Sequence, residues 1–166
     1  MRTLLFTAVL AVLLTPAVFA QLDSDSHIVT VTVDALDAVD VSDAQVDLVI
    51  AINLGTGAGQ ATDSSSTLNW ATNGAARRIT VQTDRGTINY PLYVLASGVS
   101  GSATPGVGGS RGTAGGEVQL STTAQSLVTG IAYADGNCSL TYRATATVAV
   151  APGTESHNVT YTLTTP

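Results

Sequence analysis

Strict alternation of apolar and polar residues in the C-terminal third constrains the fold more than any other feature of the chain. Between residues 140 and 150 the even positions are apolar and the odd positions are mostly threonine, and residues 159–163 repeat the pattern. A period of two is typical of a β-strand with one buried and one solvated face. The intervening sequence APGT, residues 151–154, is rich in turn formers, so the two segments are predicted to form an antiparallel hairpin.

Shorter alternating segments upstream predict further strands. Their residue ranges are 68–70, 79–82, 88–94, 118–120 and 127–133. Asn73-Gly74 is a favoured tight-turn dipeptide, so the first two segments should form a second hairpin. Pro91 cannot donate a backbone hydrogen bond, which favours an edge strand or a bulge for the third segment.

Near the N-terminus the valines stand at odd positions, 29, 31, 33, 39 and 41, whereas Val46, Leu48, Ile50 and Ile52 stand at even positions. We expect a first strand with a continuation, then a turn and a second strand. Five aspartates accompany this change of parity, at positions 34, 37, 40, 43 and 47. Asp37 and Asp43 then fall in connecting turns, and the other three point to solvent. The stretch lacks the glycine of a typical calcium loop, which favours an acidic strand edge over a calcium site.

Two stretches rich in Gly and Ser, residues 53–67 and 96–116, interrupt the alternation and are expected to be loops. The second is interpreted as a flexible hairpin tip, with a binding loop as the alternative. No segment predicts a helix. With about nine short strands, the sequence predicts an all-β fold, a single Ig-like antiparallel β-sandwich.

The first twenty residues predict a cleaved signal peptide. Arg2 precedes an apolar run that ends before Thr15-Pro16, and small residues follow at the cleavage site. Residues 21–166 would form one domain, with no membrane span after cleavage. We therefore expect a secreted, extracellular or cell-surface protein, with the periplasm as a further possibility.

Charge and ligand chemistry exclude several classes of function. All six cationic residues are arginines, against twelve acidic residues, so nucleic acid is not an expected partner. Cys138 is the only cysteine and cannot form an intrachain disulfide. His27, Cys138 and His157 lack metal-ligand spacing, so no metal or other cofactor is expected.

Candidate catalytic residues are sparse, and we expect no enzymatic activity. Residues 108–112, GGSRG, match the G-x-S-x-G pattern around Ser110, but the strand-to-helix context of a nucleophile elbow is absent. Its base would have to be His27 or His157. Glu117 and Glu155 are interpreted as surface carboxylates rather than a glycosidase pair.

Aromatic residues offer one candidate ligand platform. Trp70 and Tyr90 share the parity of apolar neighbours and are predicted to be core residues, whereas Tyr93 points to the opposite face. A small secreted carbohydrate-binding module, with polysaccharide contacting Tyr93, is therefore the alternative function.

The C-terminal forty residues carry a family resemblance. The sequence LVTGIAYADGNCSLTYRATATVAVAPGTESHNVTYTLTTP, with some echo in VTVTVDALDAVDVS, resembles the closing hairpin of bacterial secreted sandwich domains of the spore coat protein U and WxL groups. The first group implies pilus-like subunits that polymerise by strand donation. The second implies cell-wall attachment.

Strand donation requires an N-terminal segment of alternating apolar residues, and Ile28, Val29, Val31 and Val33 have this form. An ordinary first strand of the sandwich is the alternative. We expect a secreted or cell-surface structural or interaction protein, a pilus-like or matrix subunit assembling through β-strand pairing. Its partners would be further copies of itself or other surface proteins.

Overall fold

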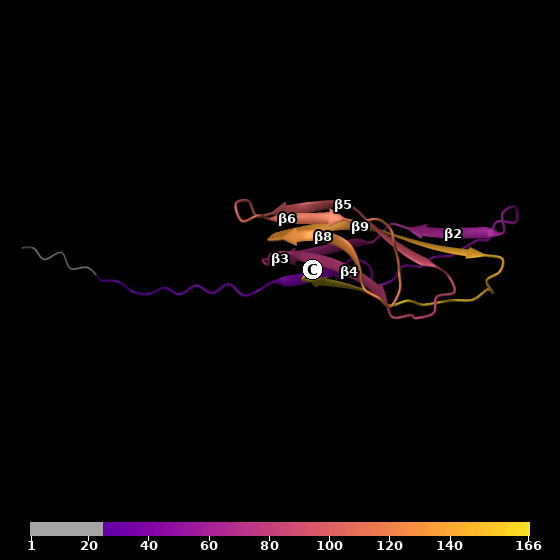
Figure 1. Ribbon diagram of the computed structural model, residues 1–166, viewed down its shortest axis with the longest axis horizontal. Helices are drawn as coiled ribbons and strands as arrows, with labels where there is room; N and C mark the ends of the chain where they lie inside the picture. The colour runs from indigo at the N-terminus through magenta and orange to yellow at the C-terminus, as the bar shows by residue number, and fades with distance from the viewer. Residues whose placement is uncertain (1–24) are drawn as a thin grey trace, which may run out of the picture. The chain divides into compact units, whose positions relative to one another are not determined.

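A computed structural model describes residues 25–166, so the predicted signal peptide, residues 1–20, lies outside the described residues. The chain divides into an N-terminal unit that ends at Val33 and a larger unit, Asp34–Pro166. Every strand found in the described part belongs to the larger unit (Figure 1). No helix long and apolar enough to cross a membrane occurs between residues 25 and 166.

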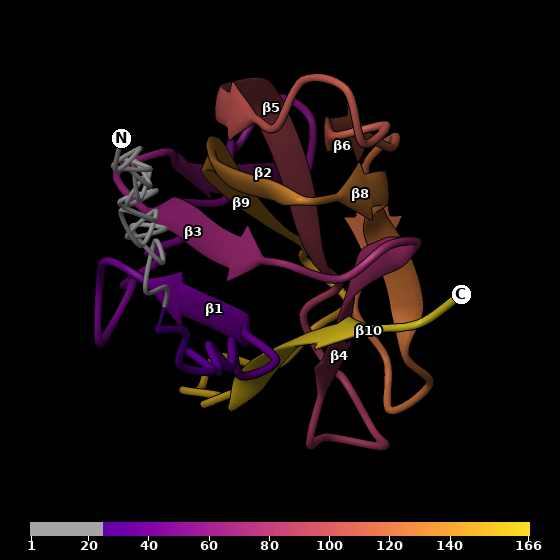
Figure 2. The same ribbon diagram turned by 90° about the vertical axis from the view of Figure 1, so that its left-hand side faces the viewer.

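The described strands number ten. They are β1 (Asp37–Val41), β2 (Ala58–Asp63), β3 (Thr67–Thr72), β4 (Arg77–Thr83), β5 (Leu92–Ala103), β6 (Ser110–Ala114), β7 (Val118–Gln119), β8 (Gln125–Ala132), β9 (Ala134–Thr147) and β10 (Val159–Thr164). A six-stranded sheet has the order β1-β3-β9-β5-β7, with β2 also paired to β9, and a four-stranded sheet has the order β10-β4-β8-β6. The two layers face each other in Figure 2, and every strand pair is antiparallel. The prediction of an all-β antiparallel sandwich is confirmed.

The core lies between the two sheets and follows the alternation seen in the sequence. In β9 the even positions are buried, among them Cys138, Leu140 and Tyr142. Trp70 of β3 and Ile79 of β4 belong to the same buried cluster. Tyr90, predicted to be a core residue, is only partly buried, because it precedes β5 and its hydroxyl bonds to a loop.

Both predicted hairpins are wrong, since each joins strands of different sheets. β9 pairs with β5 on one side and with β2 and β3 on the other, so no edge is left for β10, which pairs with β4. The predicted continuation of β9 to residue 150 also fails, because the strand ends at Thr147 and Val148 is exposed. β3 pairs with β1 and β9, whereas β4 pairs with β10 and β8.

The N-terminal strands are shorter than predicted. Residues 29–36 form no strand, and β1 begins at Asp37, which was expected in a turn. Residues 46–52 also form no strand, although Val46, Leu48 and Ile50 turn inward and pack against the core.

Much of the two Gly/Ser-rich stretches is strand rather than loop. The first contains β2, which pairs with β9, and the second contains the end of β5 and all of β6. The register of β5 shifts between Ser97 and Ser100. Gly98 (φ 66°) lies within this shift and Gly101 (φ 121°) just after it, and both adopt conformations that other residues disfavour. Pro91 lies just before β5, which is not an edge strand over Tyr93 and Val94, because β7 pairs there.

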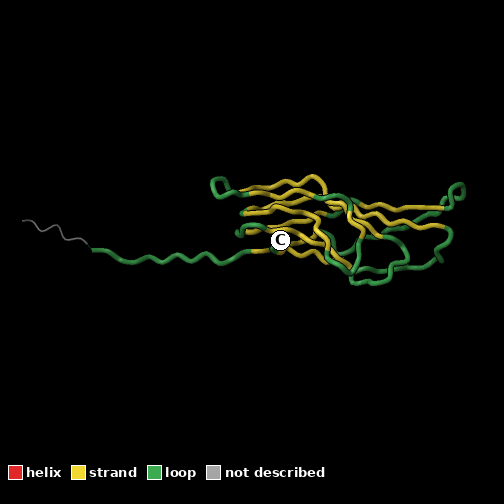
Figure 3. The backbone as a smooth tube through the Cα atoms, in the orientation of Figure 1, coloured by secondary structure: helices red, strands yellow, loops and turns green. Residues whose placement is uncertain are grey.

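The six-stranded sheet extends further than the four-stranded sheet at one end. β2 and the C-terminal half of β9 continue beyond the strands of the four-stranded sheet (Figure 1). At this end the strands are faced by loops rather than by a second sheet, as Figure 3 shows. The sandwich is therefore incomplete there.

Candidate functional site

The N-terminal unit presents a run of exposed β-branched residues. Ile28, Val29, Val31 and Val33 are 94%, 71%, 81% and 80% exposed, and residues 28–33 form no strand. Single exposed apolar residues are ordinary on protein surfaces, but several exposed apolar residues close together indicate an interaction site. Burying each of these side chains would contribute roughly 1.5–3 kcal/mol. We call residues 28–33 the donor segment, after the strand donation that the sequence analysis predicts for them.

Asn73 fixes the point where the chain enters the sandwich. Its side-chain amide donates to the carbonyl of Asp34 (2.7 Å), and its Oδ1 accepts from the backbone N–H of Leu36 (2.8 Å). The backbone N–H of Asn73 donates to the carbonyl of Leu36 (3.1 Å). Instead of closing a tight hairpin, Asn73 anchors residues 34–36 at the C-terminal end of β3.

Asp37 extends this anchor into β1. Its carboxylate accepts two bonds from Arg77 Nε (3.0 and 3.1 Å) and one from the hydroxyl of Thr72 (2.5 Å). The bond from Arg77, followed by that from Thr72, lowers the pKa of Asp37. The first strand is thus tied to both β3 and β4.

At the incomplete end of the sandwich lies a groove of about 1150 Å³. Its floor is the inner face of the six-stranded sheet, formed by Leu92, Tyr142, Ala144 and Ala146. These four side chains are only 6–9% exposed, so the two walls already cover most of the floor. Residues 43–52 and residues 150–158 form its two walls.

The first wall is strand-like in pattern but unpaired. Val46, Leu48 and Ile50 turn toward the core, while Asp47 and Val49 face solvent. Among the hydrogen bonds of the described residues, none involves a backbone N–H or C=O of residues 44–52.

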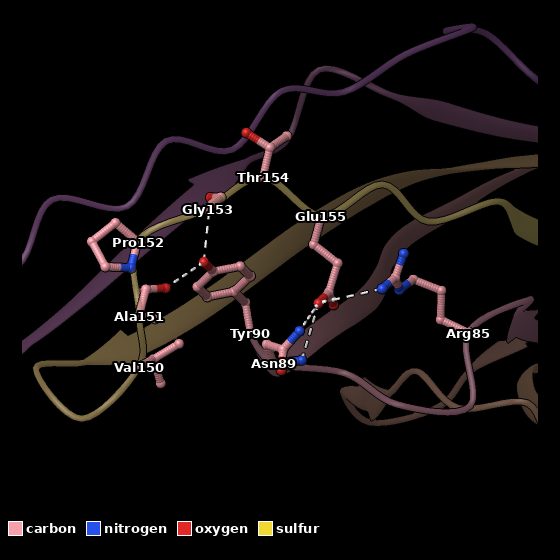
Figure 4. Close-up of a pocket in the computed structure, with 9 residues that line it drawn as sticks. All are labelled: Arg85, Asn89, Tyr90, Val150, Ala151, Pro152, Gly153, Thr154 and Glu155. Atoms are coloured by element: carbon pink, nitrogen blue, oxygen red, sulfur yellow. Dashed lines mark hydrogen bonds and ion pairs between the residues drawn. The ribbon is translucent and has the colours of Figure 1, made fainter.

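The second wall is held in place by side chains from the 84–91 loop (Figure 4). The hydroxyl of Tyr90 lies 2.9 Å from the carbonyl oxygen of Ala151 and 3.3 Å from that of Gly153. Glu155 accepts from the backbone and side-chain nitrogens of Asn89 (3.2 and 2.7 Å) and lies 3.7 Å from Arg85 Nη2. Between this wall and the loop is a small pocket of about 260 Å³.

Glu155 also contacts His157, which lies 2.9 Å away through Nε2. Burial of Glu155, whose side chain is 3% exposed, acts to raise its pKa, but the bonds from Asn89 and the charge of Arg85 lower it overall. Nδ1 of His157 lies 3.2 Å from the hydroxyl of Thr83. This hydroxyl–imidazole–carboxylate row resembles a catalytic relay, but Thr83 is buried and offers no nucleophile to a substrate.

Two tyrosines join the sheets at the inner end of the groove. The hydroxyls of Tyr142 in β9 and Tyr161 in β10 lie 2.7 Å apart. Burial raises the pKa of both hydroxyls. The pair therefore stays neutral and bridges the two layers.

The candidate platform residue Tyr93 lies on the outer face of β5. The guanidinium of Arg143 sits 4.1 Å from the centre of its ring, and Arg143 donates from Nε to Glu117 (2.9 Å). This bond lowers the pKa of Glu117. A sugar stacking on the same side of the ring would have to displace Arg143.

The remaining sequence candidates are dispersed. Ser110 begins β6 in an antiparallel sheet, and its hydroxyl accepts from the N–H of Gly112 (3.2 Å). Cys138 is a free, buried thiol whose pKa burial raises to about 11. Within residues 25–166 no group of three or more His, Cys, Asp or Glu side chains is arranged to hold a metal ion.

Sequence reasoning singled out residues 28–33 from their alternation, and their role as a donor segment stays a prediction. It missed the groove and the Asn73 anchor. The inward alternation of Val46, Leu48 and Ile50 was the available signal for one wall. No protein-family model, curated protein or solved structure matches the chain.

Proposed function

We propose that the protein is a secreted or cell-surface structural subunit that self-associates by β-strand pairing and donates residues 28–33. The observation that carries this proposal is the exposure of Ile28, Val29, Val31 and Val33 in a segment that belongs to no sheet. Export is part of the proposal and rests on the sequence of residues 1–20.

Strand addition suits the chemistry of the donor segment. In an extended conformation Val29, Val31 and Val33 share one face, while Thr30 and Thr32 share the other. In β-augmentation the backbone of an added strand supplies hydrogen bonds, and alternate side chains fill apolar pockets. Residues 28–33 carry no charge, so their burial involves no charge desolvation.

The alternative function, carbohydrate binding, has weaker support. Tyr93 is the residue on which it depends, and Arg143 covers one side of its ring. No second exposed aromatic was expected on that face from the sequence. Assembly is therefore the function that the geometry supports best.

Sedimentation velocity of the exported chain, residues 21–166, over a wide concentration range tests the proposal. A triple-serine variant with Val29→Ser, Val31→Ser and Val33→Ser removes the apolar face. The matched control, Thr30→Ser and Thr32→Ser, changes only the other face. We expect concentration-dependent multimers for the wild type and the control, and a monomer for the triple-serine variant.

A wild-type chain that stays monomeric at every concentration would overturn the proposal. So would multimers that persist unchanged in the triple-serine variant. In either case a glycan-array screen with a Tyr93→Ala variant would then test the carbohydrate alternative.

A further inference from the structure

The end of the sandwich that β2 and β9 extend carries most of the exposed apolar side chains of residues 34–166. Six large apolar residues are exposed in this unit, and four of them lie on two neighbouring segments at this end: Val49, Ile52, Leu54 and Val148. The segments meet where β9 ends, since the N–H of Val148 donates to the carbonyl of Gly57 (2.9 Å) and Thr147 pairs with Ala58. We call the four exposed residues the apolar tip.

The apolar tip lies in parts of the chain that carry no charge. Residues 48–62 and 144–154 contain no Asp, Glu, Lys or Arg, although acidic residues outnumber basic ones by twelve to six in the whole chain. Charged residues return directly beyond these ranges, at Asp47, Asp63, Arg143 and Glu155. The tip therefore offers no ion pair to a charged partner, and it can leave water without desolvating a charge.

The turn that carries Leu54 satisfies most of its own backbone donors. The N–H of Asn53 donates to the carbonyl of Ala58 (2.9 Å), and the N–H groups of Thr56 and Gly57 donate to the carbonyl of Asn53 (3.3 and 2.8 Å). The N–H of Gly55 donates to Oδ1 of Asn53 (2.7 Å). Because an unpaired N–H is costly outside water, this turn can enter a less polar medium at a lower cost than an open loop.

The apolar tip is too small for a stable protein interface. Such an interface uses about 20–30 residues from each partner, whereas the tip has four, on a projecting turn and a strand end (Figure 1). A lipid bilayer needs no complementary surface, and apolar side chains bind it by shallow insertion at the boundary between headgroups and acyl chains. The excess of acidic residues disfavours a membrane with a negative surface.

We infer that the apolar tip inserts into the interface of a lipid bilayer whose headgroups carry no net charge. This inference goes beyond the proposed function and does not depend on strand donation, since the tip lies wholly within residues 34–166. Leu54, which is fully exposed at the turn, enters furthest, and Ile52 and Val148 flank it. The protein then lies on the membrane without spanning it.

Flotation of the exported chain, residues 21–166, with phosphatidylcholine vesicles tests the inference. The triple-serine chain is the parent protein, because the apolar side chains of residues 28–33 are exposed and offer a second contact with lipid. In this background, Leu54→Ser with Val148→Ser removes the tip. Val107→Ser is the matched control, since Val107 is also exposed but lies in the turn between β5 and β6, at the opposite end of β9.

We expect the parent to bind half-maximally at about 0.1–1 mM accessible lipid, no more tightly than a single myristoyl chain does. Leu54→Ser with Val148→Ser should weaken binding about tenfold or more, because two apolar side chains are lost from the contact. Val107→Ser should bind as the parent does. Adding phosphatidylglycerol to the vesicles should weaken binding at low salt, and high salt should restore it by screening the repulsion.

Brominated lipids show which part of the protein enters the bilayer. Leu54→Trp places an indole at the turn, while the native Trp70 is buried and serves as an internal reference. Phosphatidylcholine brominated along its acyl chains should quench the fluorescence of Leu54→Trp and leave that of Val107→Trp unchanged. Melting temperatures equal to that of the parent show that the variants remain folded.

Three results would overturn the inference. The first is no binding at about 10 mM lipid, and the second is equal binding by the parent and by Leu54→Ser with Val148→Ser. The third is a lipid-free multimer of the wild type that Leu54→Ser with Val148→Ser dissociates, which would assign the tip to a protein contact. Strand donation is judged separately, by sedimentation of the triple-serine variant, so either proposal can fail alone.

Discussion

At the scale of single residues, the packing of Trp70 depends on the absence of a side chain opposite it. Trp70 in β3 pairs with Gly136 in β9, and a Cβ on Gly136 would lie 2.5 Å from indole carbons. Because Trp70 is buried in the core, it has little room to move. This glycine therefore allows the largest core side chain to lie flat on its own sheet.

Gly136→Ala should lower the free energy of unfolding by about 1–3 kcal/mol, the usual cost of overpacking. Urea unfolding of the two proteins measures the difference. Gly116→Ala is the control, since a Cβ there meets nothing within 4 Å. A Gly136→Ala protein as stable as the Gly116→Ala control would contradict the close packing of the Trp70 indole against Gly136.

Asp37 makes the anchor of β1 sensitive to acid. Its pKa is lowered in the folded protein by Arg77 and Thr72, so folding favours the charged form. The contribution of the Asp37 carboxylate to the free energy of unfolding is complete above pH 3.8, the ordinary pKa of this group. It is lost as the pH falls through the lower pKa that Asp37 has in the folded protein.

Asp37→Asn should therefore destabilise the protein at neutral pH, and the difference from the wild type should shrink as the pH falls below about 3.8. Urea midpoints of both proteins across this range test the expectation. A difference that stays constant down to the acid limit would contradict the role given to the Asp37 carboxylate.

At the scale of elements, the hydroxyl pair of Tyr142 and Tyr161 connects the two sheets beside the groove. Tyr161→Phe leaves the Tyr142 hydroxyl without its partner and should lower stability by about 0.5–1.5 kcal/mol. Thermal unfolding compares Tyr161→Phe with the control Tyr133→Phe. The hydroxyl of Tyr133 takes part in none of the hydrogen bonds between residues 25 and 166. Equal melting temperatures for the two variants would count against the bridge.

The sequence indicated the type of several elements but not their pairing. Alternation is a local property, so it located β4, β8, β9 and β10 and the buried face of β9. Neighbours in a sheet depend on which edges are free, and other strands occupy both edges of β9 and both edges of β3. Both hairpin predictions failed for this reason.

Strands rich in glycine were missed because side-chain pattern contributes little to them. β2, the end of β5 and β6 form through backbone bonds to β9 and β8, which no local signal in their own residues indicates. The same reasoning applies to the site. Alternation drew attention to residues 28–33, whose donation stays a prediction, whereas the groove brings together residues from distant parts of the chain.

At the scale of the whole molecule, the proposed donation of residues 28–33 from each copy to the next would produce an open-ended assembly. A heterologous contact that does not close generates filaments rather than fixed dimers. The account therefore predicts growth with concentration, and elongated particles in negative-stain electron microscopy.

The most direct test of the central claim is amide hydrogen exchange of the peptide covering residues 28–33, compared between dilute and concentrated protein. Pairing with a second copy predicts fast exchange of residues 28–33 when the protein is dilute and strong protection when it is concentrated. Fast exchange of residues 28–33 in concentrated protein, whether or not multimers form, would contradict the claim that this segment becomes a strand of its neighbour.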